Sequence, residues 1–191
     1  MINWDSSHNS LGMMATGSIT ILTFQMNGQV YGLPVTAVRQ LIEMVKIAEL
    51  PQAPPAIQGV INVHGQIVPV MDLRLCFGLE FKPYGLRTPI ILLEANGRMF
   101  GLVVDEVATV LTINSIDIQT SNKIIDQENI AAPGQTNYLS SVAKINNQIV
   151  MILDVDCLLS QEQASKLTQL FIQQQIEPNT EAAKNKALTG V

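Results

Sequence analysis

The chain has few side chains that can act as a nucleophile, a base or a metal ligand. Its histidines are His8 and His64, and its cysteines are Cys76 and Cys157. His64 sits in a predicted turn with no nucleophile motif around it. Both cysteines lie in apolar runs, which raise the pKa of a thiol and suppress the reactive thiolate. The four residues also lack metal-ligand spacing, and the glycines do not form a phosphate loop. The sequence therefore predicts no catalytic residue, no metal site and no cofactor.

Acid–base catalysis would require two carboxylates that meet in space. By side-chain type the candidates are Asp105, Glu106, Asp154 and Asp156. Nothing in their spacing brings two of them together, and carboxylates far more often face solvent or cap helices. We expect a protein that is not an enzyme; a small hydrolase with a carboxylate pair is the rival hypothesis.

The composition points away from nucleic acid and membrane. The net charge is −5, and lysine and arginine are scattered singly, so a phosphate backbone finds no basic patch. No apolar stretch approaches the ~20 residues of a membrane span, and residues 1–17 lack the basic start of a signal peptide. Charged residues make up only 14%, which favours apolar surface available to partner proteins. We expect a cytoplasmic protein with free thiols, no nucleic-acid partner and no direct membrane insertion.

Two pairs of hairpins are repeated in the same order. Asn27-Gly28 and Asn96-Gly97 each separate β-branched or aromatic runs, as a type I′ turn requires. Residues 27–38 align with residues 96–107 at an offset of 69, and residues 64–73 align with residues 146–155 at an offset of 82. The apolar positions match well beyond the turns. This match favours one unit used twice, across roughly residues 19–78 and 88–159; the alternative is that unrelated hairpins look alike.

The fold class predicted from this repeat is all-β. About five short strands per unit favour a small barrel, with one barrel for each half of the chain. Asp72 is expected to cap a short helix that Gly78 ends, and Asp154 to do the same in the second unit. Ser160 opens a C-terminal helix. Pro69 cannot donate a ladder hydrogen bond and so indicates an edge strand or a strand end.

The stretch from Gly59 to Arg74, GVINVHGQIVPVMDLR, closely resembles the signature of the CheW family of chemotaxis coupling proteins. The segments Tyr31-Gly32-Leu33, Leu50-Pro51 and Gly101–Val107 match the same family in order. The resemblance covers about residues 18–160. It implies two Src-homology-3-like five-stranded β-barrel subdomains around a shared core, followed by a C-terminal helix. Together with the composition of the two ends, this gives an expected organisation of a disordered segment at 1–17, the domain at 18–160, a helix at 161–176 and a flexible tail at 177–191.

The resemblance also implies an adaptor that links the cytoplasmic tip of a methyl-accepting chemoreceptor to a CheA-type histidine kinase. One barrel rim would pack on the kinase, and the groove between the barrels would receive the receptor tip. The family's partner-contact positions correspond here to Val38, Gln40, Gly59, His64, Val107 and Val110. We expect Val38→Asp to weaken partner binding without unfolding the protein; unfolding would assign Val38 to the core.

Two positions depart from the family. His64 stands where many members carry arginine, and Gln40 stands where they carry a glutamate that can pair with it. A neutral hydrogen bond between Gln40 and His64 would replace the ion pair, and the lost positive charge would alter partner choice. This points to an array for pilus-based motility or phototaxis, with a merely tolerated turn variant as the alternative. A rival function is a regulator that occupies the kinase docking surface without binding receptors.

Overall fold

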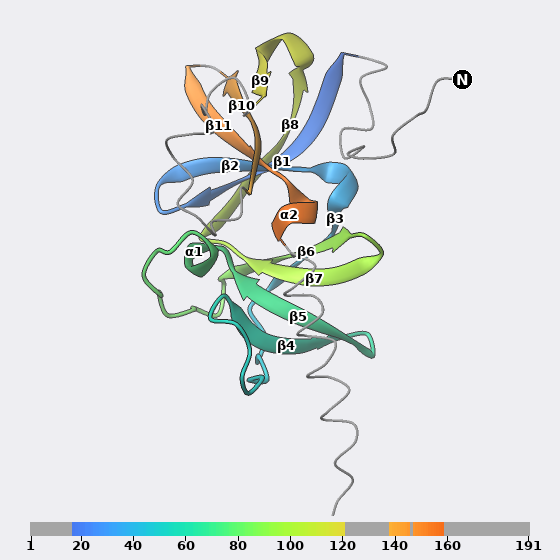
Figure 1. Ribbon diagram of the computed structural model, residues 1–191, viewed down its shortest axis with the longest axis vertical. Helices are drawn as coiled ribbons and strands as arrows, with labels where there is room; N and C mark the ends of the chain where they lie inside the picture. The colour runs from blue at the N-terminus through green and yellow to red at the C-terminus, as the bar shows by residue number, and fades with distance from the viewer. Residues whose placement is uncertain (1–16, 121–137, 146, 159–191) are drawn as a thin grey trace, which may run out of the picture.

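The computed structural model describes residues 17–120, 138–145 and 147–158 (Figure 1). The first half of the chain contains β1 (Ser18–Met26), β2 (Gln29–Pro34), the 3₁₀ helix η1 (Val35–Ala37), β3 (Val38–Glu43), β4 (Ile57–Val63), β5 (Gln66–Asp72) and α1 (Leu73–Cys76). The second half contains β6 (Pro89–Ala95), β7 (Arg98–Val103), β8 (Glu106–Asn114), η2 (Ser115–Asp117), β9 (Ile118–Thr120), β10 (Leu139–Ile145), β11 (Gln148–Leu153) and α2 (Val155–Leu158).

The tight turns form as the sequence predicts. Asn27 and Gly28 have φ values of 49° and 76°, and Asn96 and Gly97 have φ values of 51° and 71°. Positive φ at both central residues is the type I′ conformation, whose twist matches that of the flanking strands. His64 adopts the same conformation, with a φ of 51°, in the turn between β4 and β5. Histidine, like asparagine and aspartate, enters this backbone region more often than other side chains do, so His64 fits the turn.

The strands form two sheets, and each sheet takes strands from both halves of the chain. The first sheet has the order β8-β1-β2-β11-β10-β9 and the second has the order β3-β6-β7-β5-β4. The upper and lower bodies of Figure 1 are these two sheets, with α1 and α2 between them. The all-β class with two Src-homology-3-like subdomains is confirmed. The prediction of one barrel per contiguous half is wrong, because each half donates its first hairpin to the other half's barrel.

The two halves nevertheless share one register. Phe24 pairs with Tyr31 in the first hairpin, as Leu93 pairs with Phe100 in the hairpin 69 positions later. The parallel contacts also correspond, since β2 pairs with β11 as β7 pairs with β5. The strand exchange therefore has a pseudo-twofold relation. The short strand β9 adds a sixth strand to the first sheet, where the sequence predicts five.

The apolar side chains of the described residues form three buried clusters, because several strands are covered on both faces. One cluster fills the first barrel around Ile21 and Ile152, and another fills the second barrel around Val70 and Leu92. The largest cluster lies between the barrels and includes Phe24. In β6 successive residues alternate between the second barrel and this central core, so the run Ile90–Leu93 is fully buried. The shared core that the sequence predicts is thus confirmed.

Pro69 lies in an inner strand, so its interpretation as an edge-strand residue is wrong. Strand β5 has β7 on one side and β4 on the other. The residue of β4 that lies opposite Pro69 is Val60. Its N–H donates to the carbonyl of Ala48 at 2.8 Å, and its carbonyl accepts from the N–H of Ala48 at 2.9 Å, so both groups point away from β5. The nitrogen of Pro69 therefore faces β7, one residue before the ladder with β7 begins at Val70. A missing N–H costs no ladder bond at that point.

Both short helices begin as predicted, at an aspartate. The Asp72 carboxylate accepts the backbone N–H of Arg74 at 2.9 Å, and that of Asp154 accepts the N–H of Asp156 at 3.0 Å. Gly78 follows α1 with a φ of 71°. Residues 1–16 of the segment predicted at 1–17 lie outside the described residues, as do the segments predicted at 161–176 and 177–191. None of the described helices has the length and hydropathy to span a membrane.

Candidate partner-binding surfaces

The cysteines have none of the features of reactive thiols. Both are free. Burial, aided by the charge of Asp72, raises the pKa of Cys76 to about 12. Burial and the nearby Asp154 raise the pKa of Cys157 to about 11. Neither thiol ionises appreciably at neutral pH, as the sequence predicts. Across residues 17–120, 138–145 and 147–158, no three histidine, cysteine or acidic side chains gather to hold a metal ion.

The candidate acid–base carboxylates have structural roles or face solvent. Asp154 caps α2. Asp105 accepts the backbone N–H of Asn27 at 2.8 Å and the guanidinium of Arg74 at 3.2 Å. Glu106 is exposed at the start of β8. Asp105 and Asp154 thus hold the backbone in place.

A buried ion cluster lies where α1 meets both barrels. Asp72 is 0% exposed and Arg74 is 5% exposed. The guanidinium binds Asp72 through Nε and Nη2, both at 3.1 Å, and reaches Asp105 through Nη1. The Tyr84 hydroxyl donates to Asp72 at 2.8 Å. Burial and this hydrogen bond raise the pKa of Tyr84, so that it remains a neutral donor.

Arg74 thereby connects the two barrels. Asp72 ends β5 in the second barrel, whereas Asn27 lies in the β1–β2 turn of the first. Because Asp105 accepts from both Arg74 and Asn27, a single guanidinium fixes that turn relative to α1. The Arg74–Asp72 part of this connection is buried, where charge-assisted hydrogen bonds are strong and directional, whereas Asp105 is partly exposed.

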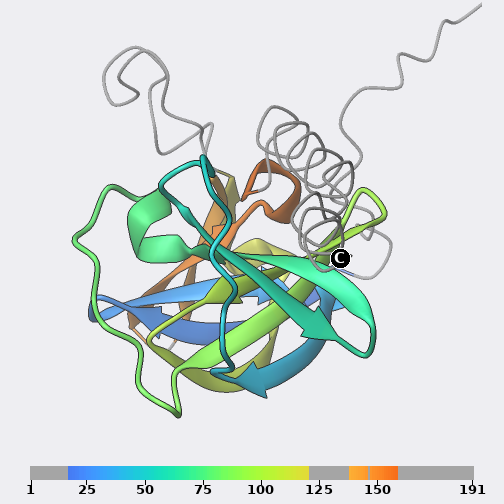
Figure 2. The same ribbon diagram turned by 90° about the horizontal axis from the view of Figure 1, so that it is seen from below.

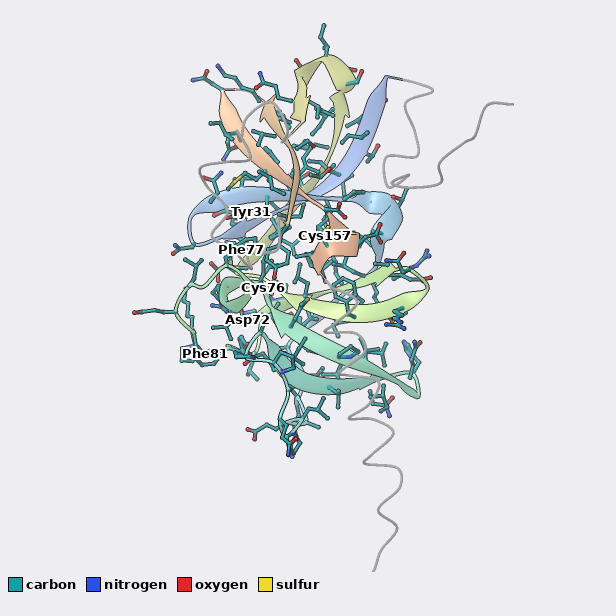
Figure 3. The ribbon with its side chains drawn as sticks, in the orientation of Figure 1. Tyr31, Asp72, Cys76, Phe77, Phe81 and Cys157 are labelled. Atoms are coloured by element: carbon teal, nitrogen blue, oxygen red, sulfur yellow. The ribbon has the colours of Figure 1, made fainter. Side chains whose placement is uncertain are left out.

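An aromatic groove opens beside this cluster. The rings of Phe24, Tyr31, Phe77 and Tyr138 form a series with successive centroid distances of 5.7, 5.4 and 5.9 Å. Tyr31 and Phe77 lie one above the other where α1 approaches β2 (Figure 3). A cavity of about 330 Å³ is lined by Met26, Asn27, Gln29, Tyr31, Phe77, Leu79, Tyr138, Leu139, Met151 and Leu153. Burial raises the pKa of Tyr31, in keeping with this apolar lining.

Four of the six predicted partner-contact residues lie on two equivalent strands. Val38 and Gln40 are on β3, and Val107 and Val110 are on β8, which holds the same position in the other barrel. Val38 and Val107 occupy matching positions, half-buried against the central core. Gln40 is exposed, as is Val110 at 53%. β3 and β8 thus lie at equivalent ends of the two sheets, and each has one valine that packs against the central core.

The other two predicted residues lie on the second barrel. Gly59 is buried in β4, where a Cβ atom would overlap the carbonyl oxygen of Ala48 and φ is 140°. His64 is exposed in the following turn. The hydrogen bond predicted between Gln40 and His64 does not form in the described part of the chain. Gln40 is beside β6 at one end of the sheet order, and His64 is in the turn of β4, at the other end.

Exposed apolar side chains recur at equivalent positions of the two barrels. Leu41 on β3 corresponds to Val110 on β8, with exposed fractions of 46% and 53%. Ile67 on β5 corresponds to Ile149 on β11, at 51% and 57%. Their recurrence at equivalent positions makes them candidates for surfaces that another protein covers.

The sequence indicates neither the residues of the aromatic groove nor those of the ion cluster. Tyr31 and Arg74 were noted only as parts of matching segments, and Tyr138 carried no signal of its own. The one usable sign was the pairing of Asp72 with Arg74, because a helix cap followed by arginine two residues later can form a local ion pair. Asp105 is 31 positions away, so no local pattern connects it to Arg74.

Most of the chain is similar to known chemotaxis proteins. The family model described as a CheW-like domain matches residues 20–163. The protein described as chemotaxis protein CheW from Klebsiella aerogenes is 29% identical over 142 residues, which is 74% of this chain and 82% of that protein. A protein named PilI from Pseudomonas aeruginosa is 31% identical over 84 residues, covering 44% of this chain and 47% of PilI.

A solved structure shows the same fold. The crystal structure of the scaffolding protein TtCheW from Thermoanaerobacter tengcongensis superposes with a TM-score of 0.64. It is 27% identical in sequence, and the match covers 74% of this chain and 92% of that one.

Proposed function

The chain belongs to the CheW-like domain family, and from this premise we propose that it couples the cytoplasmic tip of a chemoreceptor to a CheA-type histidine kinase. Proteins of this family are non-catalytic scaffolds and adaptors in chemotaxis, so the chain is not an enzyme. The partners and the assignment of surfaces to them are our proposal.

The observation that carries the proposal is the duplication of exposed apolar positions. An adaptor has to hold two partners at once, and therefore needs two separate surfaces. Leu41 and Val110 lie on the edge strands β3 and β8, whereas Ile67 lies on β5 beside the turn that contains His64. Each set combines an apolar centre with polar neighbours, as non-obligate interfaces do.

We assign the receptor tip to the region between the barrels, along β3 and β8, whose inner valines pack against the central core, and the kinase to the rim formed by His64 and Ile67. Val38, Gln40, Val107 and Val110 support the first assignment because they lie on the two equivalent strands. In the second assignment, the rim formed by His64 and Ile67 packs on a related barrel of the kinase. Gly59 supports this rim by letting β4 pass close to the backbone of Ala48.

Pairwise binding tests this assignment. Val110→Asp places a charge on an exposed apolar position, so we expect receptor-tip affinity to fall roughly tenfold or more while kinase affinity is kept. Ile67→Asp should have the opposite pattern. Ile116→Asp is the matched control, because Ile116 is 88% exposed in η2, outside both surfaces.

The same measurements distinguish the coupling function from the rival function of a kinase regulator. Kinase binding with no receptor binding by the unmodified chain would identify a regulator of the kinase docking surface. Loss of both interactions in either single variant would contradict the division into two surfaces.

A pilus-based array is the more specific proposal. The match to the protein named PilI and the departures at Gln40 and His64 support it. We expect His64→Arg to shift preference towards a kinase from a general chemotaxis array, measured as a ratio of the two dissociation constants. An unchanged ratio would leave His64 as a tolerated turn residue.

A further inference from the structure

The segment between α1 and β6 presents apolar side chains away from both assigned surfaces. In Figures 1 and 2 this connection bows out from the sheets on the side of α1. We call residues 79–88 the connecting loop. Phe81 is 53% exposed and Leu86 is 87% exposed, and both belong to the set of large apolar side chains that the described residues leave in solvent.

The connecting loop is anchored to the body of the protein. The hydroxyl of Tyr84 reaches the buried Asp72, and the guanidinium of Arg74 lies 5.6 Å from the centroid of its ring. Phe81 packs edge-on against Tyr84 at 5.3 Å. Asp72 is itself fixed by the ion cluster. Phe81 is thus displayed by a fixed support, which lowers the entropy that a partner must remove on binding.

A turn shapes the end that carries Leu86. The backbone N–H of Gly85 donates to the hydroxyl of Thr88 at 2.8 Å, and the N–H of Thr88 donates to the carbonyl of Gly85 at 3.0 Å. Leu86 sits inside this closed turn and points its side chain into solvent. Its exposure is therefore set by the backbone.

Two cations accompany the apolar side chains. Lys82 and Arg87 are exposed, and no described carboxylate lies within ion-pair distance of either one. Elsewhere Arg39 pairs with Glu94, and Arg74 pairs with the buried Asp72 and the partly exposed Asp105. Glu80 is the single acid of the loop, so its net charge is positive in a chain of net charge −5.

We propose that the connecting loop is a docking surface for an acidic segment of a partner protein that carries large apolar side chains. Carboxylates of that segment pair with Lys82 and Arg87, while its apolar side chains cover Phe81 and Leu86. Complementary charge steers such an encounter, and the apolar contact retains the partner. The surface is additional to those assigned to the receptor tip and the kinase. A lipid surface fits less well, because two cations beside Glu80 provide little attraction to anionic lipids.

The test uses the full chain and a fluorescent amphipathic helical peptide with glutamate on one face and leucine on the other. We expect saturable binding, by anisotropy, that weakens as salt is added. Lys82→Glu together with Arg87→Glu should weaken binding roughly tenfold or more. Arg98→Glu with Lys144→Glu is the matched control, since both are exposed cations outside the loop, and should change binding much less.

Leu86→Ser tests the apolar part of the proposal. Because this side chain is almost entirely in solvent, the variant should keep the thermal transition of the parent protein and lose affinity for the peptide. Equal binding of a peptide with lysine in place of glutamate would overturn the proposal, as would an equal loss in the control variant. Tighter binding to phosphatidylglycerol vesicles than to the peptide would overturn it in favour of a membrane. The assay contains neither kinase nor receptor, so its failure leaves the coupling function untouched.

Discussion

The two helical corners of the molecule have the same backbone design and different side chains. In the α1 corner, residues 72–78, Asp72 caps the helix and also holds the guanidinium of Arg74. In the α2 corner, residues 154–158, Asp154 caps the helix in the same way, but Asp156 occupies the position of Arg74. The helix cap is thus common to both corners, whereas the buried ion cluster belongs to one.

Helix capping is a requirement of the fold, whereas the buried ion cluster is an addition to one corner. Capping satisfies backbone N–H groups at any helix start, so both corners retain it. The guanidinium does more, because through Asp105 it fixes the β1–β2 turn at the edge of the aromatic groove. The equivalent of Asp105 in the first half is Thr36, which cannot provide a second carboxylate. The barrels are similar in register, but the contact between them is held asymmetrically.

The largest expected effect comes from breaking the cluster. Arg74→Met leaves Asp72 buried without its counter-ion, and removing one partner of a buried ion pair typically costs about 3–5 kcal/mol. We expect a loss of that size in the free energy of unfolding, measured by urea denaturation. Asp156→Met, at the equivalent and less buried position, should cost under about 1 kcal/mol. Equal losses in the two variants would contradict the asymmetry.

A smaller effect is expected where the halves differ in the backbone. Gly59 corresponds to Ser141, yet only Gly59 has the backbone of Ala48 across it. We expect Gly59→Ala to lower the free energy of unfolding by roughly 3 kcal/mol, from steric overlap and positive φ. Ser141→Ala should cost less, under about 1 kcal/mol, because it removes only one small buried hydroxyl. A folded, fully stable Gly59→Ala variant with weakened partner binding would instead make Gly59 a direct contact.

The smallest effect concerns the two thiols, one in each corner. Their raised pKa values, about 12 for Cys76 and about 11 for Cys157, leave little thiolate at pH 8. Burial raises the pKa of Cys76 more than that of Cys157, so iodoacetamide should modify Cys157 faster than Cys76. Peptide mapping of single-cysteine variants measures the two rates. Faster modification of Cys76 would contradict the tighter burial of the α1 corner.

The thiols also predict the direction of a pH dependence. A thiol whose pKa is raised in the folded state stays protonated while the unfolded chain ionises. Its contribution to stability is complete below the ordinary thiol pKa near 9 and is lost as pH rises towards 12. Cys76→Ala should therefore flatten the alkaline decline in the free energy of unfolding. An unchanged slope would mean that Cys76 is not the group responsible.

Local features were predictable from the sequence because their causes are local. Asn27-Gly28 requires positive φ, and Asp72 lies directly before the helix that it caps, so neighbouring residues were enough. The exchange of hairpins between the barrels could not be predicted. The pattern of apolar side chains along β6 would be the same whichever barrel the strand joined. The ion cluster depends on Asp105, which approaches Arg74 only after β5 and β7 pair in parallel. Partner positions such as Val38 and Val110 came from family resemblance and remain predictions.

The coupling role is tested most directly by assembly. Kinase and receptor-tip fragments are sedimented together, with this chain present or absent, and kinase activity is followed in the same samples. The account predicts that the chain brings both partners into one complex and changes kinase output, and that Val110→Asp and Ile67→Asp each abolish the three-part complex. Binding of the chain to neither partner, or a complex that forms equally well without it, would contradict the account.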